Sequence, residues 1–191
     1  MSRELRYASV TVLLVLVLAG LIGIRIYTLK SGFQIRLRTA PMNVEPLILG
    51  DEVEFDYEIA RLNLTTLPGD NQFELWDTVY VKLGRLPNGE WVAQSTHRAM
   101  PPLTGYEVVL KGEVEEREYL ENVPPPVLIT KEIKVRYGIE RYAVPRDKFD
   151  PLPPYGSPVR PVTVHAAVNP AGRAVITGVR VNNERYGEPI L

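Results

Sequence analysis

An uncharged apolar run near the N-terminus constrains this chain more than any other feature. Residues 7–24 (YASVTVLLVLVLAGLIGI) contain no charged side chain. As a helix, a run of this length spans roughly 27 Å, close to the apolar thickness of a bilayer. Arg25 and Lys30 follow, and their long stems can carry the charges to the interface. The run predicts a transmembrane anchor over residues 7–27 that contacts membrane lipid, preceded by a short cytoplasmic segment, residues 1–6.

A cleaved secretory signal is the alternative interpretation of the same run. Arg3 and Arg6 give it the basic start that signals have. However, a signal has a shorter apolar core and a cleavage site of the A-x-A kind, and no such site follows here. More basic residues follow the run than precede it, so charge alone favours a cytoplasmic domain. Because long domains cross membranes largely regardless of charge, we expect the remainder of the chain to be extracytoplasmic.

The composition of residues 31–191 predicts one folded domain without catalytic or metal chemistry. Its length of about 160 residues is enough for a hydrophobic core. The net charge of the chain is −1, which gives no electrostatic basis for binding nucleic acid. Cysteine is absent, so disulfides and thiolate metal sites are excluded. His97 and His165 have no second histidine at metal spacing and no evident serine or aspartate partner, so we predict no metal, no cofactor and no catalytic residue.

Short alternating segments between prolines and glycines predict a mainly β domain of sandwich or barrel type. The expected strands are residues 33–38, 50–60, 106–114 and 127–137, with two hairpins, 78–86 with 90–96 and 162–168 with 173–181. Asn88-Gly89 predicts a two-residue turn in the first hairpin. Residues 115–121 fit either an extension of the preceding strand or a short helical turn. The Pro-rich residues 145–161 predict a loop without regular structure, which we consider a docking arm for a partner.

One face of the expected strand at residues 50–60 is entirely acidic and consists of Glu52, Glu54, Asp56 and Glu58. Acids on one strand face do not wrap around an ion, so we do not interpret them as a calcium site. Instead, basic side chains across the sheet should relieve their repulsion. The candidates are Arg36 and Arg38, or Lys134 and Arg136.

Two segments resemble the motif blocks of a known family. Residues 49–57 (LGDEVEFDY), which include Gly50, Asp51 and Tyr57, look like the motif that names the GDYXXLXY family of bacterial membrane-associated proteins. Residues 136–145 (RYGIERYAVP) look like the second block of that family, and the closing hairpin AVNPAGRAVITGVRV also fits.

The first block departs from the family pattern, because Glu52 replaces its first Tyr and Phe55 its Leu. In the second block, Ala143 stands where an aromatic is more usual. The resemblance implies a single-pass protein of the bacterial cytoplasmic membrane with an extracytoplasmic domain of unassigned function, often found beside multispanning membrane proteins. It supplies no catalytic assignment.

The second block gathers side chains of the kind that most often anchor interfaces. The candidate residues are Arg136, Tyr137, Gly138, Glu140, Arg141 and Tyr142. Two interpretations are open: a site for a partner or ligand, or a buried buttress in which Glu140 pairs with an arginine and the tyrosines pack on the sheet. In either case, Gly50-Asp51 should form a turn that begins its strand, with Asp51 bonded to nearby backbone amides.

Two functional hypotheses follow. The first is a membrane-anchored, non-catalytic protein whose β domain binds a protein partner as an accessory subunit of a larger assembly. The alternative is a signal-peptidase-like hydrolase fold, because the segment after Pro41 is loosely similar to the nucleophile region of those enzymes. Pro41 occupies the serine position there, and proline cannot attack a carbonyl, so such a fold would be inactive. An active hydrolase would need a cleft in which Ser95, Ser157 or another hydroxyl meets a lysine or histidine.

Overall fold

The computed structural model describes residues 3–40, 52–120, 130–143, 162–181 and 184–186. Within these ranges the elements follow the order α1 (Arg3–Ser31), β1 (Phe33–Arg38), β2 (Glu52–Glu54), the 3-10 helix η1 (Glu58–Ala60), β3 (Arg61–Asn63), β4 (Thr78–Arg85), β5 (Trp91–His97), β6 (Glu107–Tyr119), β7 (Thr130–Arg136), β8 (Arg141–Ala143), β9 (Thr163–Val168), β10 (Ala174–Val181) and β11 (Glu184–Tyr186). The prediction of a mainly β domain that follows one apolar helix is confirmed.

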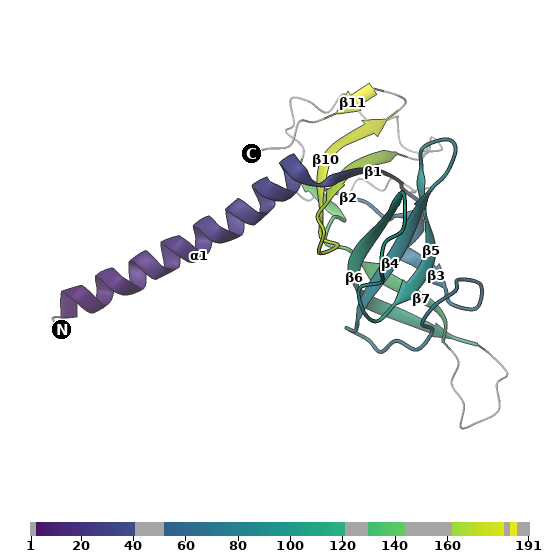
Figure 1. Ribbon diagram of the computed structural model, residues 1–191, viewed down its shortest axis with the longest axis horizontal. Helices are drawn as coiled ribbons and strands as arrows, with labels where there is room; N and C mark the ends of the chain where they lie inside the picture. Colours follow the sequence, from purple (N-terminus) through teal and green to yellow (C-terminus); the bar gives the residue numbers. More distant parts are fainter. Residues whose placement is uncertain (1–2, 41–51, 121–129, 144–161, 182–183, 187–191) are drawn as a thin grey trace.

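Helix α1 stands clear of the β domain over most of its length (Figure 1). Its segment Ser9–Lys30 has a mean hydropathy of 2.5, and its apolar side chains are exposed rather than packed on the domain. In its last turn, Thr28 is 2% exposed, so the domain begins to cover the helix there. The helix is therefore long and apolar enough to cross a membrane, and the domain leaves its apolar surface uncovered.

The strands form two larger antiparallel sheets and a two-stranded ribbon. One sheet has the order β1-β9-β10-β11, the other β3-β7-β6-β4-β5, and the ribbon is β2-β8. The two sheets curl around a shared core (Figure 1). Alternation explains which side chains enter that core, since Ile35 and Leu37 of β1 are buried while Arg38 is exposed.

Both predicted hairpins are present, and each closes with a three-residue loop. The Gly89 N–H donates to the Leu86 carbonyl (2.8 Å), and the Gly172 N–H donates to the Asn169 carbonyl (2.9 Å). The two glycines have φ of 84° and 80°, in the left-handed region. The two-residue turn predicted at Asn88-Gly89 is wrong, because Pro87 takes the first turn position and moves the glycine to the third.

The single strand predicted over residues 50–60 is also wrong. The pairing with β8 continues as far as Phe55, whose N–H donates to the Glu140 carbonyl (2.6 Å), and it ends there because the Asp56 carbonyl accepts from the Ala40 N–H (2.8 Å) instead. The chain continues as η1 and β3, so the alternating residues do not share one flat face. Residues 50 and 51 lie outside the described residues.

The predicted pairing of acidic and basic side chains is correct at one of its candidate positions. Arg38 contacts Glu58 (3.4 Å). Lys134 instead pairs with Glu115 and Glu116 (3.4 and 3.2 Å), both on the neighbouring strand β6. The same strand supplies Glu113 to Arg136 (3.1 Å), so β6 takes the basic residues that we assigned to the acidic strand.

Two further expectations concern β6, β7 and the Pro-rich segment. Residues 115–119 extend β6 rather than forming a helical turn. Of the strand predicted over residues 127–137, Thr130–Arg136 form β7, and residues 127–129 lie outside the described residues. The Pro-rich loop predicted at residues 145–161 lies outside the described residues.

Candidate functional site

The two motif blocks lie side by side in the fold. Strand β2 pairs with β8 so that Glu54 is opposite Arg141. The hydrogen bond from the Phe55 N–H to the Glu140 carbonyl continues this pairing by one step. Segments that are far apart in the sequence therefore form one ribbon, next to the paired strands β6 and β7.

Tyr57 and Tyr137 join the two blocks through reciprocal hydrogen bonds. The Tyr57 hydroxyl donates to the Ile139 carbonyl (2.6 Å), and the Tyr137 hydroxyl donates to the Ile59 carbonyl (2.7 Å). The two residues are 1% and 6% exposed. Burial raises the pKa of both phenols well above the ordinary tyrosine value, and the Glu140 charge raises it further. We call this pair the tyrosine lock, because the Tyr57 hydroxyl satisfies a carbonyl of the second block and the Tyr137 hydroxyl satisfies a carbonyl of η1, directly after the first block.

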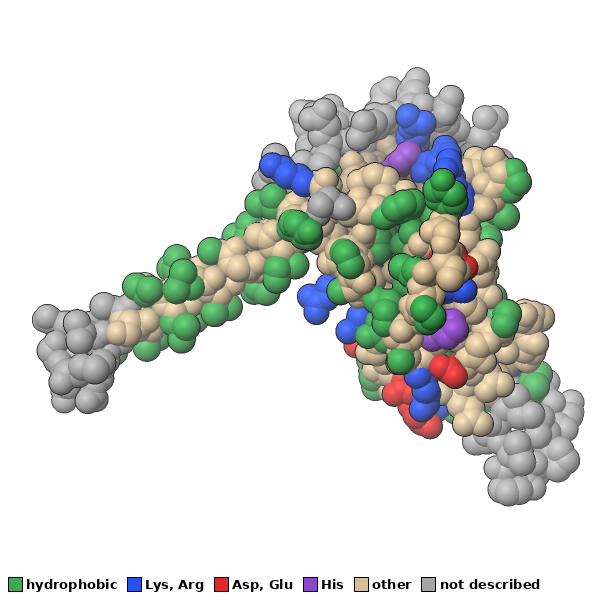
Figure 2. All heavy atoms as spheres, in the orientation of Figure 1, with side chains coloured by type: hydrophobic (Ala, Val, Ile, Leu, Met, Phe, Trp, Pro, Cys, Tyr) green, Lys and Arg blue, Asp and Glu red, His purple; other side chains and the backbone are tan. Residues whose placement is uncertain are grey.

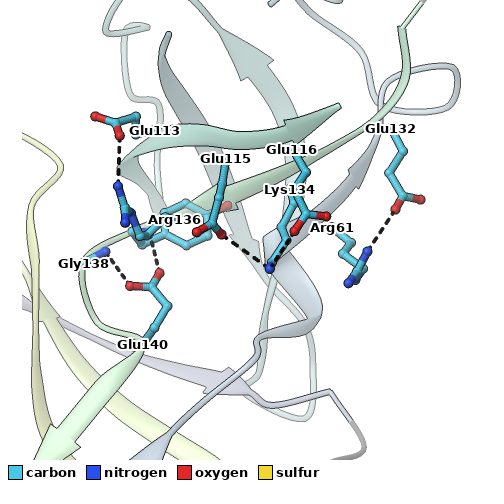
Figure 3. A network of polar contacts seen from close by, with 10 residues as sticks. Arg61, Glu113, Glu115, Glu116, Glu132, Lys134, Arg136, Gly138 and Glu140 are labelled. Atoms are coloured by element: carbon cyan, nitrogen blue, oxygen red, sulfur yellow. Dashed lines mark hydrogen bonds and ion pairs between the residues drawn. The ribbon is translucent and has the colours of Figure 1, made fainter. Parts of the chain in front are cut away.

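Glu140 stabilises the turn that connects β7 to β8. Its carboxylate accepts hydrogen bonds from the backbone N–H groups of Tyr137 (2.5 Å) and Gly138 (2.9 Å). Figure 3 shows the contact between Glu140 and Gly138. Gly138 has a φ of 78°, which glycine adopts without strain. The predicted pairing of Glu140 with an arginine is therefore wrong, because the carboxylate binds local backbone donors and Arg136 binds Glu113.

A groove of about 580 Å³ lies between the β2–β8 ribbon and strands β6 and β7. Its charged lining residues are Glu54, Asp56, Glu115, Glu140, Lys134, Arg136 and Arg141. Figure 3 shows the Lys134 ammonium between Glu115 and Glu116. The hydrogen bond to Glu116 raises the pKa of Lys134. Arg141 is exposed and forms no ion pair within the described residues. The groove therefore combines two cations that are paired with carboxylates, Lys134 and Arg136, with one that is not.

The family model described as GDYXXLXY protein matches residues 14–179. The chain belongs to the GDYXXLXY family. The match runs from α1 to β10 and includes both motif blocks, so the tyrosine lock and the groove lie inside it. No curated protein and no solved structure matches this chain.

The structure brings together most of the residues that the GDYXXLXY motifs singled out. Tyr142 is buried in the core, while Arg141 beside it faces the groove. Gly50, Asp51 and Pro41 lie outside the described residues. Sequence reasoning missed Lys134 as a groove residue. The sequence pattern that could have predicted it is the row of acidic residues in β6, since these residues lie opposite the basic residues of β7 in the paired strands.

A serine–histidine pair lies on β5, away from the GDYXXLXY blocks. Ser95 Oγ is 2.9 Å from His97 Nε2, so the expectation that His97 lacks a serine partner is wrong. Residues two apart on a strand share a face, which explains the contact. Within the described residues, no carboxylate orients the His97 ring, and Ser95 is 8% exposed. Lys82 lies opposite Ser95 on the neighbouring strand and forms an ion pair with Glu107 (3.1 Å). The pKa of Glu107 is lowered mainly by a hydrogen bond from the Thr104 backbone and also by the hydrogen bond from Lys82.

Proposed function

We propose that this protein is a membrane-anchored, non-catalytic binding protein. Helix α1 crosses the bacterial cytoplasmic membrane once, and the β domain lies on the extracytoplasmic side. There the domain presents its charged groove to a protein partner, as an accessory subunit of a larger membrane assembly.

The observation that carries this proposal is the junction between α1 and the β domain. Gly32 alone separates the helix from β1, and its N–H donates to the Thr28 carbonyl (2.9 Å). The Thr28 hydroxyl accepts a hydrogen bond from the Asn169 side-chain amide (3.1 Å), which belongs to the β9–β10 turn. A domain joined in this way has no flexible linker, so an anchored α1 would keep it at the membrane surface. Partners in the same membrane are then within reach.

The groove supports the second part of the proposal. Both motif blocks of the family contribute to it, and the tyrosine lock fixes the ribbon on one of its sides. Arginine side chains bind carboxylates through paired hydrogen bonds and are frequent in interface hot spots. The exposed Arg141 offers such a contact to an acidic side chain of the partner, while Glu54 and Asp56 offer contacts to basic ones.

Site-specific photo-crosslinking in intact cells tests the proposal. A photo-reactive amino acid at Glu54, on the groove, should give a discrete crosslinked species, whereas the same group at Asn88, on the exposed β4–β5 loop, should not. Arg141→Glu should reduce the Glu54 product at least fivefold, because it reverses the unpaired charge across the ribbon. Equal products at both positions, or no product at Glu54, would refute partner binding at the groove.

The Ser95–His97 pair supports a second candidate function, that of a serine hydrolase. The arrangement lacks an acidic residue that orients His97 within the described residues, and this favours a structural hydrogen bond. A fluorophosphonate probe separates the two functions. We expect no labelling of the purified chain, and labelling that disappears in Ser95→Ala would favour the hydrolase. The inactive signal-peptidase-like alternative depends on Pro41 and stays a prediction.

A further inference from the structure

We infer that a basic collar at the junction of α1 and the β domain binds the phosphate head groups of anionic phospholipids. The collar consists of Arg25, Lys30, Lys111 and Arg173. This inference rests on the proposed membrane anchoring by α1, and it adds the lipid class that the domain recognises.

The β9–β10 turn places two of these residues beside the end of the helix. The side-chain amide of Asn169 donates to Thr28 of α1, and its oxygen accepts from the Arg173 N–H (3.0 Å). The carbonyl of Gly172, in the same turn, accepts from the Lys111 N–H (2.8 Å). One tight turn therefore contacts the helix, Arg173 and Lys111, so these two positions are fixed relative to α1.

The charges of the collar are not neutralised within the described residues. Arg25, Lys30 and Arg173 are exposed and Lys111 is half-buried, and none of the four forms an ion pair there. The Lys111 ammonium lies 5.9 Å from the centre of the Tyr80 ring, a contact that leaves its charge available. At other positions of the sheet to which Lys111 belongs, carboxylates pair with Lys82, Lys131, Lys134 and Arg136.

The position of the collar favours a lipid surface as its ligand. Figure 2 shows lysine or arginine side chains that project from the edge of the domain into the angle between the domain and α1. If α1 spans the bilayer, this angle faces the head groups. Arg25 and Lys30 lie in the last two turns of α1, and their long stems can carry their charges toward the head groups. Basic residues close to an anionic bilayer each strengthen the attraction to it, and the effect falls off within a Debye length.

Head-group quenching in nanodiscs tests the inference on the full chain. The chain has no cysteine, so Ala171→Cys at the exposed tip of the β9–β10 turn gives one labelling position for a fluorophore. Nanodiscs contain either neutral phosphatidylcholine alone or a mixture with phosphatidylglycerol, each with a quencher attached to some head groups. We expect at least twofold stronger quenching in the anionic discs, and we expect high salt to abolish the difference.

Charge variants decide between the collar and a general charge effect. Lys111→Gln with Arg173→Gln should remove the difference between the two lipids, whereas the control pair Arg61→Gln with Lys131→Gln, on β3 and β7, should keep it. Equal quenching in both lipids, or the same loss in the control pair, would overturn the inference. Competition by inorganic phosphate at constant ionic strength would also overturn it, by indicating a site for the free anion. Failure of the chain to enter nanodiscs at all would instead refute the anchoring by α1.

Discussion

At the scale of single residues, the tyrosines of the two motif blocks act through their hydroxyl groups. The Tyr57 hydroxyl satisfies the Ile139 carbonyl in the second block, and the Tyr137 hydroxyl satisfies the Ile59 carbonyl in η1, directly after the first block. A buried carbonyl that loses its donor costs free energy, because no water replaces the bond. Tyr57 and Tyr137 therefore stabilise the wall of the groove.

The tyrosine lock predicts the effect of removing either hydroxyl. Tyr57→Phe and Tyr137→Phe should each lower the free energy of unfolding by about 1–3 kcal/mol, since the ring remains and a carbonyl is left without its donor. Urea denaturation of the detergent-solubilised chain measures this. Tyr106→Phe is the matched control, because Tyr106 is 83% exposed, and it should change the value by less than about 0.5 kcal/mol. Equal effects in all three variants would show that the two bonds contribute nothing.

The same residues predict the response of stability to alkaline pH. Burial raises the pKa of Tyr57 and Tyr137 in the folded state, so above about pH 10 the unfolded chain loses protons that the folded chain keeps. Their contribution to stability is complete below pH 10 and decreases as the pH rises. The decrease is about 1.4 kcal/mol per pH unit for each phenol. Urea titrations at pH 9 and 11 should show a shallower loss in Tyr57→Phe than in the wild type, and identical slopes would contradict the assignment.

At the scale of elements, the β9–β10 turn connects three parts of the fold, namely β6, α1 and the sheet of β1. A side chain at Gly172 would require an unfavourable φ, and its Cβ would lie 3.1 Å from the Lys111 nitrogen. Gly105 also has a positive φ of 69°, but a Cβ there would meet no atom within 4 Å. The two glycines thus share the backbone requirement and differ in their surroundings.

This difference gives a prediction for the turn. Gly105→Ala should lower the melting temperature slightly through backbone strain of about 1–2 kcal/mol. Gly172→Ala should lower it further, because the added methyl group presses on the backbone of β6. Thermal unfolding followed by circular dichroism compares the two variants. A Gly105→Ala variant at least as unstable as Gly172→Ala would show that the turn does not pack on β6 as described.

The elements also show how far the sequence predicts the structure. Strand β1 and both hairpins follow from alternation and from glycines after prolines, which are local signals. The interruption after β2 was not predictable, because it depends on a hydrogen bond from the Ala40 N–H to the Asp56 carbonyl, and these residues are remote in the sequence. Reciprocal tyrosine bonds end on carbonyls, and any residue supplies a carbonyl. The tyrosines of the lock therefore bind partners that the sequence does not mark. As a result, the charged and aromatic residues of the motif blocks did not reveal which of them are buried in the tyrosine lock and which line the exposed groove.

At the scale of the whole molecule, the chain is an apolar helix joined to a β domain without an intervening linker. The hydrogen bond between Thr28 and Asn169 joins the domain to the helix, and the position of the basic collar beside the helix depends on that junction. In our proposal the acyl chains of the membrane lipids cover the apolar side chains of α1, which the β domain leaves exposed. The partner then meets a domain that is held at the bilayer surface.

The intact mass of the chain that native membranes retain after alkaline carbonate washing tests this account most directly. We predict that the membrane pellet contains the chain with residues 3–31 still attached, because α1 lies in the bilayer. A chain recovered in the soluble fraction that begins after residue 24 would contradict the account. It would identify the apolar helix as a cleaved signal and leave the domain without an anchor.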